Sequence, residues 1–390
     1  MCCVCPLINI EDIMTLNLAA DAPLLQAFAT LPDPRKSRNQ IYPLIDIIAV
    51  AIIGILCSAN DWVNVVKWAN AYESWFQSVG LCLNGVPSHD TIGRFFRLVD
   101  PKAFEHCFVQ WVRMITDEVQ GVIAIDGKTI CNSGDALSGQ KASHIVTAFA
   151  AENDIILGQL KTAEKSNEIT AIPELLDTLA LRGCVVTIDA MGCQTAITKK
   201  IRDQKGDYVI GLKGNQGKLH DEAVNFFDQA IDFSIQDTGC SYAKTVEKGH
   251  GRIEEREIWV ISDLAWLEGF ENWDGLKSLI CVRSTRYEKG KTTVERRHYI
   301  SSLLSGADRI GEIIRLHWGI ENKLHWHLDV TFNEDKSKIR AGHGAENFSL
   351  LKRCVLNLIK ADTTEKASIT TKRRMAGWDP AYRLRLLGVK

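Results

Sequence analysis

VIAIDGKTI, residues 122–130, is an apolar run that ends in a single carboxylate, Asp126, and continues into a glycine and a lysine. Consecutive apolar residues of this length are typical of a strand that is buried on both faces of a sheet. A second stretch, CVVTIDA (184–190), has the same pattern and carries Asp189 at its end. We therefore expect two buried strands with a carboxylate at the carboxyl end of each, the edge where open α/β sheets bind ligands.

The chain around these two stretches alternates in a specific order. Strands are predicted at 121–126, 143–151, 154–162, 184–190 and 207–215, and helices at 167–183, ended by Gly183, and at 194–206. A meander of three strands followed by alternating helices and strands describes the ribonuclease H-like fold, which is of the α/β class. The first and fourth strands are neighbours in that order, so we expect Asp126 and Asp189 to converge.

Changes in the hydrophobic pattern along the sequence divide the chain into five predicted parts. Apolar residues at helical spacing mark the N-terminal part, short strand-like runs mark the insertion, and a strong helix at about 308–328 marks the return to the core. The parts are an N-terminal helical domain (1–117), the first part of the core (118–215), a β-rich insertion (216–302), the C-terminal helices of the core (303–361) and a basic tail (362–390).

The composition indicates a globular chain. It has 390 residues, of which 46% are hydrophobic and 24% charged, and its formal net charge of -2 does not by itself indicate a nucleic-acid partner. Twelve cysteines are scattered, apart from CCVC at 2–5, and nothing completes a zinc site, so we expect reduced thiols in the cytosol. The most apolar segment, 44–59, is shorter than the ~20 residues of a membrane-spanning helix and is expected to lie in the core. Met1 and Met14 are both candidate start residues.

Two converging carboxylates without a partner repel each other, and a divalent cation removes that cost. Oxygen ligands favour Mg²⁺, for which Mn²⁺ is a possible substitute. A pair of such ions, about 3.5–4 Å apart, catalyses phosphoryl transfer. The alternative for each aspartate taken alone is a turn or a helix N-cap.

A third acid is expected from the strong helix that follows the insertion. Glu321 is the best candidate, because it is surrounded by apolar and aromatic residues and a polar group there needs a partner. Glu334 and Asp335 are alternatives, although a solvated turn would also explain them. His317, Glu321 and His325 follow one another at i, i+4 and i+8, so a transition-metal face is a rival interpretation.

Cationic and small polar residues near these acids are candidates for sequence-independent contacts with DNA. They are Lys128 beside the first acid, Lys213 and Asn215 after the strand at 207–215, Arg252 and Arg256 on the insertion, and Trp318 and Asn322 beside Glu321. Gly127 is expected to keep the strand end open to a phosphate. SHDTIGRFF (88–96), with Ser88 as a candidate N-cap, is either a helix-turn-helix fragment or an ordinary helix of an all-α domain.

Motifs along nearly the whole chain resemble those of DDE-type insertion-sequence transposases, specifically the H-repeat-associated (ISAs-type) group. They are AIDGKT, TIDAMGCQ, YVIGLKGNQ, HGRIEER and HWGIENKLHWHLDVTFNED, with LPDPRKSRNQIYPLIDIIAVAIIGILCSANDW and GVPSHDTIGRFFRLVD upstream. The resemblance implies a ribonuclease H-like fold, a β-rich insertion between the second and third acids, and a transposase-associated, DNA-binding N-terminal domain. It also implies that Asp126, Asp189 and Glu321 hold Mg²⁺ for strand cleavage and strand transfer.

The resemblance further implies a homodimer on double-stranded DNA, acting on terminal inverted repeats and target DNA at the nucleoid, with no membrane or small-molecule partner. The wider superfamily often places Tyr, Arg and Lys around the glutamate, at positions that are Ile314, His317 and Leu328 here. This chain departs from that pattern, and Arg315, His317 and Lys323 are candidates to replace those roles. An inactive DNA-binding relative and another ribonuclease H-like nuclease are the alternative functions.

Overall fold

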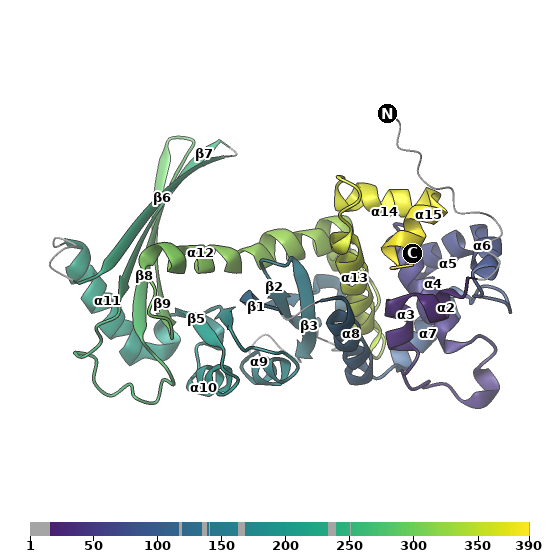
Figure 1. The fold of residues 1–390 in the computed structure, drawn as a ribbon, viewed down its shortest axis with the longest axis horizontal. Helices are drawn as coiled ribbons and strands as arrows, with labels where there is room; N and C mark the ends of the chain where they lie inside the picture. The colour runs from purple at the N-terminus through teal and green to yellow at the C-terminus, as the bar shows by residue number, and fades with distance from the viewer. Residues whose placement is uncertain are drawn as a thin grey trace.

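The computed structural model describes residues 16–116, 119–134, 139, 141–162, 168–232, 239–249 and 251–389 (Figure 1). Within these ranges the chain forms one nine-stranded sheet, with a helical region at one end of the molecule. The CCVC stretch and both candidate start residues lie outside the described residues.

Five strands build the core of the sheet: β1 (Gly121–Thr129), β2 (His144–Ala150), β3 (Ile155–Thr162), β4 (Cys184–Ile188) and β5 (Asp207–Leu212). The first three form an antiparallel meander, whereas β4 and β5 run parallel to β1, and the order is β3-β2-β1-β4-β5. This is the predicted order, and it confirms the ribonuclease H-like fold class.

The register of β1 explains how the two aspartates meet. Ile125 lies beside Ile188 in the parallel pair of β1 and β4, so Asp126 and Asp189 follow side by side. β1 does not end at Asp126 as predicted, because its antiparallel partner β2 continues the pairing as far as Thr129. Asp126 is therefore inside a strand on one side and next to the open end of β4 on the other.

The insertion between the second and third acids extends the same sheet. Its strands are β6 (Ser241–Gly249), β7 (Arg252–Ile261), β8 (Ser278–Glu288) and β9 (Lys291–Ser301), and β9 pairs antiparallel with β5. The insertion is β-rich as expected, but it begins with a 16-residue helix that was not predicted, α11 (Gly217–Asp232). Buried apolar residues at helical spacing, Leu219, Ala223 and Phe227, explain that helix.

Helices cover both faces of the core. α9 (Glu168–Asp177) and α10 (Thr195–Asp203) lie below the sheet in Figure 1, and α12 (Ala307–His317) crosses it from above. α9 ends before the predicted Gly183. The chain after α12 winds more widely, in the π-helical segments η7 (Ile320–His325) and η8 (His327–Thr331). The remaining elements of the core are α8 (Pro101–Ile115), α13 (Gly344–Ala361), and the 3₁₀ turns η2 (Cys131–Ser133), η4 (Ala190–Gly192), η5 (Gly214–Gln216) and η9 (Glu334–Lys336).

The N-terminal region is helical, as predicted. Its elements are α2 (Leu18–Asp21), α3 (Pro23–Phe28), η1 (Ser37–Asn39), α4 (Leu44–Leu56), α5 (Trp62–Ala71), α6 (Glu73–Ser78) and α7 (His89–Leu98). α4 is the predicted core helix and is buried along most of its length. No helix among the described residues is long and apolar enough to cross a membrane. Ser88 caps α7, because its hydroxyl accepts the Thr91 N–H at 3.2 Å.

Residues 362–390, predicted as a basic tail, do not form an extended tail where they are described. They fold into α14 (Ile369–Trp378) and α15 (Pro380–Leu386), which pack beside the N-terminal helices in Figure 1. Three cations of this segment, Lys372, Arg373 and Arg383, are buried. Arg373 donates to the Ile55 carbonyl at 2.7 Å, and the Arg383 guanidinium lies 4.4 Å from the Trp75 ring centre. These cations close the helical region rather than extend into solvent.

The described cysteines are free thiols, and most of them are buried. Burial raises the pKa of Cys57, Cys193 and Cys281 to about 12, so these thiols stay protonated at neutral pH. These cysteines lie in the apolar core as reduced thiols, which is what their scattered positions in the sequence predicted.

Candidate active site

Asp126, Asp189 and Glu321 line one cavity of about 400 Å³. Asp126 comes from β1, Asp189 directly follows β4, and Glu321 is in η7, which passes close to β1. Two neighbouring parallel strands and a segment more than a hundred residues later therefore deliver three carboxylates to one place. None of the three makes an ion pair with a lysine or arginine of the described chain.

Asp126 is the most strongly perturbed of these acids. Burial raises its pKa to about 7, with further contributions from the negative charges of Asp189, Glu168 and Glu321, while a hydrogen bond from the Gly127 backbone opposes the rise. The carboxylate thus lies in a place that disfavours its own charge. Such a cost is typical of sites at which a cation or a proton acts.

A neutral histidine, not a cation, accompanies Asp126. His325 Nδ1 lies 3.6 Å from Asp126 Oδ2, but burial and nearby cations lower the pKa of His325 to about 3. The imidazole is therefore uncharged at neutral pH, and its other nitrogen is buried without a hydrogen-bond partner in the described chain. It leaves the charge of Asp126 uncompensated.

The Asp189 side chain makes one hydrogen bond among the described residues. Its Oδ1 accepts the Met191 N–H at 3.0 Å and caps the turn η4, so the N-cap interpretation is correct for this residue as well. The cap fixes the carboxylate at the cavity edge. His317 also lines the cavity, where its Nδ1 lies 3.0 Å from Thr187 Oγ1 and burial lowers its pKa to about 4.

Glu321 stands on the first of the two π-helical segments and is exposed. Single wide turns of this kind concentrate at functional sites, because they aim a side chain away from the ordinary helical face. Helical spacing did not indicate this change in winding. Of the superfamily positions around the glutamate, Ile314 is nearly buried and Leu328 fully so, and only His317 adds a polar group to the cavity.

The donor set fits a hard divalent cation. Three carboxylates share a cavity, none is neutralised by a lysine or arginine, and the cost of charging Asp126 is one that such a cation relieves. Among the described residues, no three His, Cys, Asp or Glu side chains are already gathered closely enough to form a metal cluster. This holds for the three acids and for the rival transition-metal face of His317, Glu321 and His325 alike, but the three acids all line the cavity whereas His325 is not part of its lining.

Three cations line the same cavity: Lys213, Arg296 and Arg297. Lys213 was predicted, whereas the two arginines were not. They lie on β9, and only the pairing of β9 with β5 brings them to the acids. The Arg297 guanidinium lies 4.6 Å from the centre of the Trp318 ring, so the predicted Trp318 also belongs to this cavity.

Lys128 has a different place from the one predicted. Its side chain is only 9% exposed, and its Nζ lies 2.7 Å from Asp329 and 3.0 Å from Asp335. The ammonium group that was expected to contact a phosphate is thus already paired with two carboxylates. Lys128 therefore links β1 to η8 through Asp329 and to the chain that follows η8 through Asp335.

Gly127 also has a different role. A side chain at this position would collide with His144 and Glu168, which form a buried pair with His144 Nε2 2.6 Å from Glu168 Oε1. The residue is a glycine because the other face of β1 has no room for a Cβ. Gly127 also lines the cavity of the three acids, and the expectation that it keeps the strand end open to a phosphate stays a prediction.

Glu334 and Asp335, the alternative third acids, lie outside the cavity. Glu334 is 1% exposed, accepts the Ser349 hydroxyl at 2.9 Å and lies 3.2 Å from the Arg353 guanidinium. The suggestion of a solvated turn is wrong for Glu334, because the turn η9 faces the core. Asp335 is held by Lys128 and by the Cys131 N–H.

The remaining predicted contacts are dispersed. Asn215 donates to the Ala190 carbonyl at 2.8 Å, and Asn322, beside Glu321, donates to the Trp318 carbonyl at 3.2 Å. Arg252 and Arg256 on β7 pair with acids of the same hairpin and do not line the cavity. Arg315 and Lys323, which were candidates to replace the superfamily's cations, also lie outside the cavity lining. Arg315 pairs with Glu247 on β6 at 2.6 Å, and Lys323 is exposed.

Comparisons with known proteins show the family of the chain. The family described as "Transposase DDE domain" matches residues 117–358, and "DDE_Tnp_1-associated" matches residues 25–112. The "Putative transposase YncI" of Escherichia coli O157:H7 is 39% identical over 364 residues, covering 92% of this chain and 93% of that protein. The "H repeat-associated putative transposase YhhI" of Escherichia coli strain K12 is 37% identical over 367 residues, covering 92% and 96%. The chain belongs to the DDE transposase family, in its H-repeat-associated group.

Proposed function

We propose that this protein cleaves the DNA strands at the ends of its own insertion sequence and transfers them to target DNA. The observation that carries the proposal is the meeting of Asp126, Asp189 and Glu321 in one cavity without a neutralising lysine or arginine. Carboxylates that lie together without a compensating charge lower the stability of the folded protein, and metal-dependent phosphoryl transfer is a reaction that uses such a group of acids.

Asp126, Asp189 and Glu321 are the residues that would hold Mg²⁺ or Mn²⁺. A divalent cation bound there supplies charge neutralisation for the phosphate and activation of a water or a 3′-hydroxyl. The cap on Asp189 and the wide turn under Glu321 hold two of the carboxylates in position. Because His317 in the cavity lining and His325 beside Asp126 are neutral, these two histidines add no positive charge that would compete with the cation.

The cations of the cavity act on the DNA itself. We expect Lys213, which has no ion pair in the described chain, to contact phosphate oxygens near the cleaved bond. Arg296 and Arg297 are paired with Asp228 and Glu295, and they would exchange these carboxylates for phosphate oxygens when DNA binds. Trp318, already stacked under Arg297, offers an aromatic face to an unpaired base or a sugar near that bond. The substrate is double-stranded DNA carrying the terminal inverted repeats, two copies of the protein act on the paired ends, and the place of action is the nucleoid.

The test uses a labelled duplex that carries the inverted repeats flanking the gene, together with a target plasmid. The wild-type protein should nick the duplex at the repeat end in Mg²⁺ and then join the 3′ end to the plasmid, and EDTA should stop both steps. Asp126→Asn should bind the duplex equally well and lose cleavage by about a thousandfold or more.

The outcomes separate the alternatives. Tight binding by the wild-type protein without any nicking would favour an inactive DNA-binding relative. Nicking without joined products would favour another ribonuclease H-like nuclease. Cleavage at the wild-type rate by Asp126→Asn would remove the assignment of the site.

A further inference from the structure

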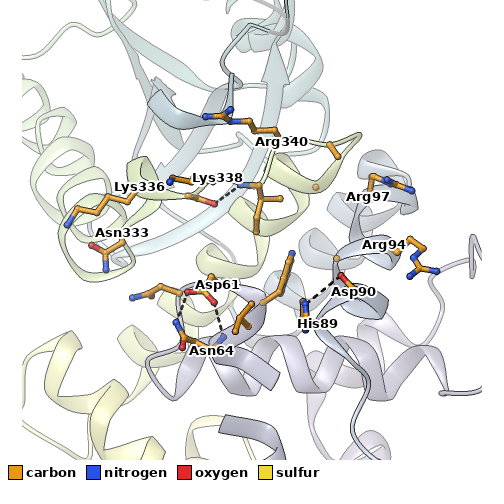
Figure 2. Close-up of a pocket in the computed structure, with 18 residues that line it drawn as sticks. Asp61, Asn64, His89, Asp90, Arg94, Arg97, Asn333, Lys336, Lys338 and Arg340 are labelled. Atoms are coloured by element: carbon orange, nitrogen blue, oxygen red, sulfur yellow. Dashed lines mark hydrogen bonds and ion pairs between the residues drawn. The ribbon is translucent and has the colours of Figure 1, made fainter. Parts of the chain in front are cut away.

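A second, larger depression of about 990 Å³ lies between the N-terminal helices and the chain that follows η8. Figure 2 shows its walls. α7 contributes Arg94 and Arg97 on one side, and the stretch 333–340 contributes Lys336, Lys338 and Arg340 on the other. We call this depression the basic groove.

The basic groove carries an excess of positive charge. Five lysines and arginines line it against two acids, Asp61 and Asp90, a difference of three positive charges. Four of the five cations (Arg94, Arg97, Lys336 and Lys338) are exposed and have no ion pair with an acid of the described chain. The protein as a whole has a net charge of -2, so the groove is a local exception that the composition hides.

The two acids of the groove are engaged locally. Asp61 caps α5, since its Oδ1 accepts the Asn64 N–H at 2.8 Å and its Oδ2 accepts the Asn64 side-chain amide at 2.6 Å. Asp90 lies 3.6 Å from the imidazole of His89. Neither acid therefore neutralises the lysines and arginines around it.

Three residues, Glu334, Asp335 and Ile339, anchor the wall that carries the lysines. Glu334 is buried against Arg353, Asp335 holds Lys128, and Ile339 packs against the core. Lys336 and Lys338 lie between these inward residues and are exposed. A wall fixed in this way loses little conformational freedom when it contacts a ligand.

The same anchors connect the basic groove to the three acids. Lys128, which holds Asp335, is two residues beyond Asp126 on β1. Arg340 Nε donates to the Asn132 carbonyl at 3.0 Å, just beyond the end of β1. The stretch that forms the groove wall also follows directly from the π-helical segments that carry Glu321. The groove wall is thus bonded to the strand that carries Asp126, although the groove and the cavity of the acids have no lining residue in common.

We propose that the basic groove binds the phosphate backbone of the double-stranded DNA that flanks the cleaved bond. This inference rests on the proposed function, because it needs DNA at the three acids. The four unpaired cations, two on each of two opposite walls, fit a polyanion such as the phosphate backbone. The contacts are to phosphates, so they position the duplex without reading its sequence.

The experiment measures binding of a fluorescent 40-base-pair duplex of arbitrary sequence in EDTA, over a range of salt concentrations. Lys336→Ala/Lys338→Ala should lower the slope of log K against log salt by about 2, since each phosphate contact contributes about 0.9. At 0.1 M salt this corresponds to roughly 60-fold weaker binding. Arg94→Ala, on the opposite wall, should lower the slope by about 1.

Lys199→Ala/Lys277→Ala is the matched control, because it removes two exposed positive charges from α10 and the loop before β8, outside the groove lining. Its slope and affinity should equal those of the wild-type protein, and circular dichroism should show all variants folded. Unchanged binding by both groove variants, or an equal loss in the control, would overturn the groove and leave the proposed function intact. Failure of the wild-type protein to bind any duplex, including one with the inverted repeats, would overturn both.

Discussion

Two groups of carboxylates lie close to β1, and only one of them has cations to neutralise it. Asp126, Asp189 and Glu321 share a cavity without an ion pair to a lysine or arginine of the described chain. Glu334 and Asp335, only a short distance further along the chain than Glu321, are each held by a cation: Arg353 holds the first and Lys128 the second.

The presence or absence of an ion pair separates the acids that stabilise the fold from the acids that we assign to the reaction. The paired acids fix the segment after η8 to the core, where an unpaired charge would be very costly. The unpaired acids raise the free energy of the folded state, as the high pKa of Asp126 indicates. Residues that destabilise their own protein in this way are typical of functional sites.

The largest expected effect separates Glu321 from Glu334. Glu321→Gln should reduce Mg²⁺-dependent cleavage by about a thousandfold while leaving stability nearly unchanged, because Glu321 is exposed and has no ion pair. Glu334→Gln should lower the free energy of unfolding by about 3 kcal/mol, because it leaves the buried Arg353 unpaired.

Cleavage assays at a temperature where both variants are folded, with urea unfolding in parallel, measure the two effects. If Glu334→Gln were stable but inactive and Glu321→Gln were active, Glu334 would be the third acid of the site and Glu321 would not.

A smaller effect follows from the pKa of Asp126. Its pKa in the folded protein, about 7, is above the ordinary value of 3.8, so the folded state binds the proton more tightly than the unfolded state does. The wild-type protein should therefore lose stability as pH rises from about 4 to 7, and Asp126→Asn should not share this loss. Because the side chain is 22% exposed, we expect the variant to be more stable by about 2 kcal/mol at pH 8 and equal to the wild type near pH 4.

Urea unfolding in EDTA across this pH range makes the measurement, and Lys199→Ala is a control that should leave the pH dependence unaltered. Parallel pH curves for the wild type and Asp126→Asn would show that the Asp126 carboxyl has no unusual affinity for its proton.

The smallest effect concerns the cation between the two groups. Lys128→Met should cost about 1 kcal/mol, because its partners Asp329 and Asp335 are partly solvated and only partly lose their compensation. DNA affinity should not change, since the ammonium group is not available to a phosphate. A salt slope lowered by about 1 in Lys128→Met would restore the contact predicted from the sequence.

The pattern of apolar runs was enough to predict the core of the fold. Period and turn residues indicated the meander, the parallel pair and the convergence of Asp126 with Asp189, because the strand order follows from local signals. The apolar and aromatic residues around Glu321 indicated it as the third acid, and the resemblance to known motifs implied the same residue. The π-helical winding around it was not predictable, since the residues there also fit an ordinary helix.

The parts that could not be predicted depend on pairing between distant segments. Arg296 and Arg297 reach the cavity only because β9 pairs with β5, and the residues around the two arginines do not indicate which strand β9 pairs with. Lys128 was expected to be free, but carboxylates some 200 residues later in the chain occupy it. The basic groove has the same origin, because α7 and the stretch 333–340 are far apart in sequence.

The most direct test of the central claim is a calorimetric titration of Mn²⁺ into the DNA-free protein at pH 6.5 and pH 9. We expect the wild-type protein and Glu334→Gln to bind Mn²⁺, with release of a proton at pH 6.5 and almost none at pH 9, because Asp126 has a pKa of about 7. Asp126→Asn should bind at least about tenfold more weakly and release no proton. Equal Mn²⁺ affinity and equal proton release in the wild type and Asp126→Asn would contradict the claim that the unpaired acids form the metal site.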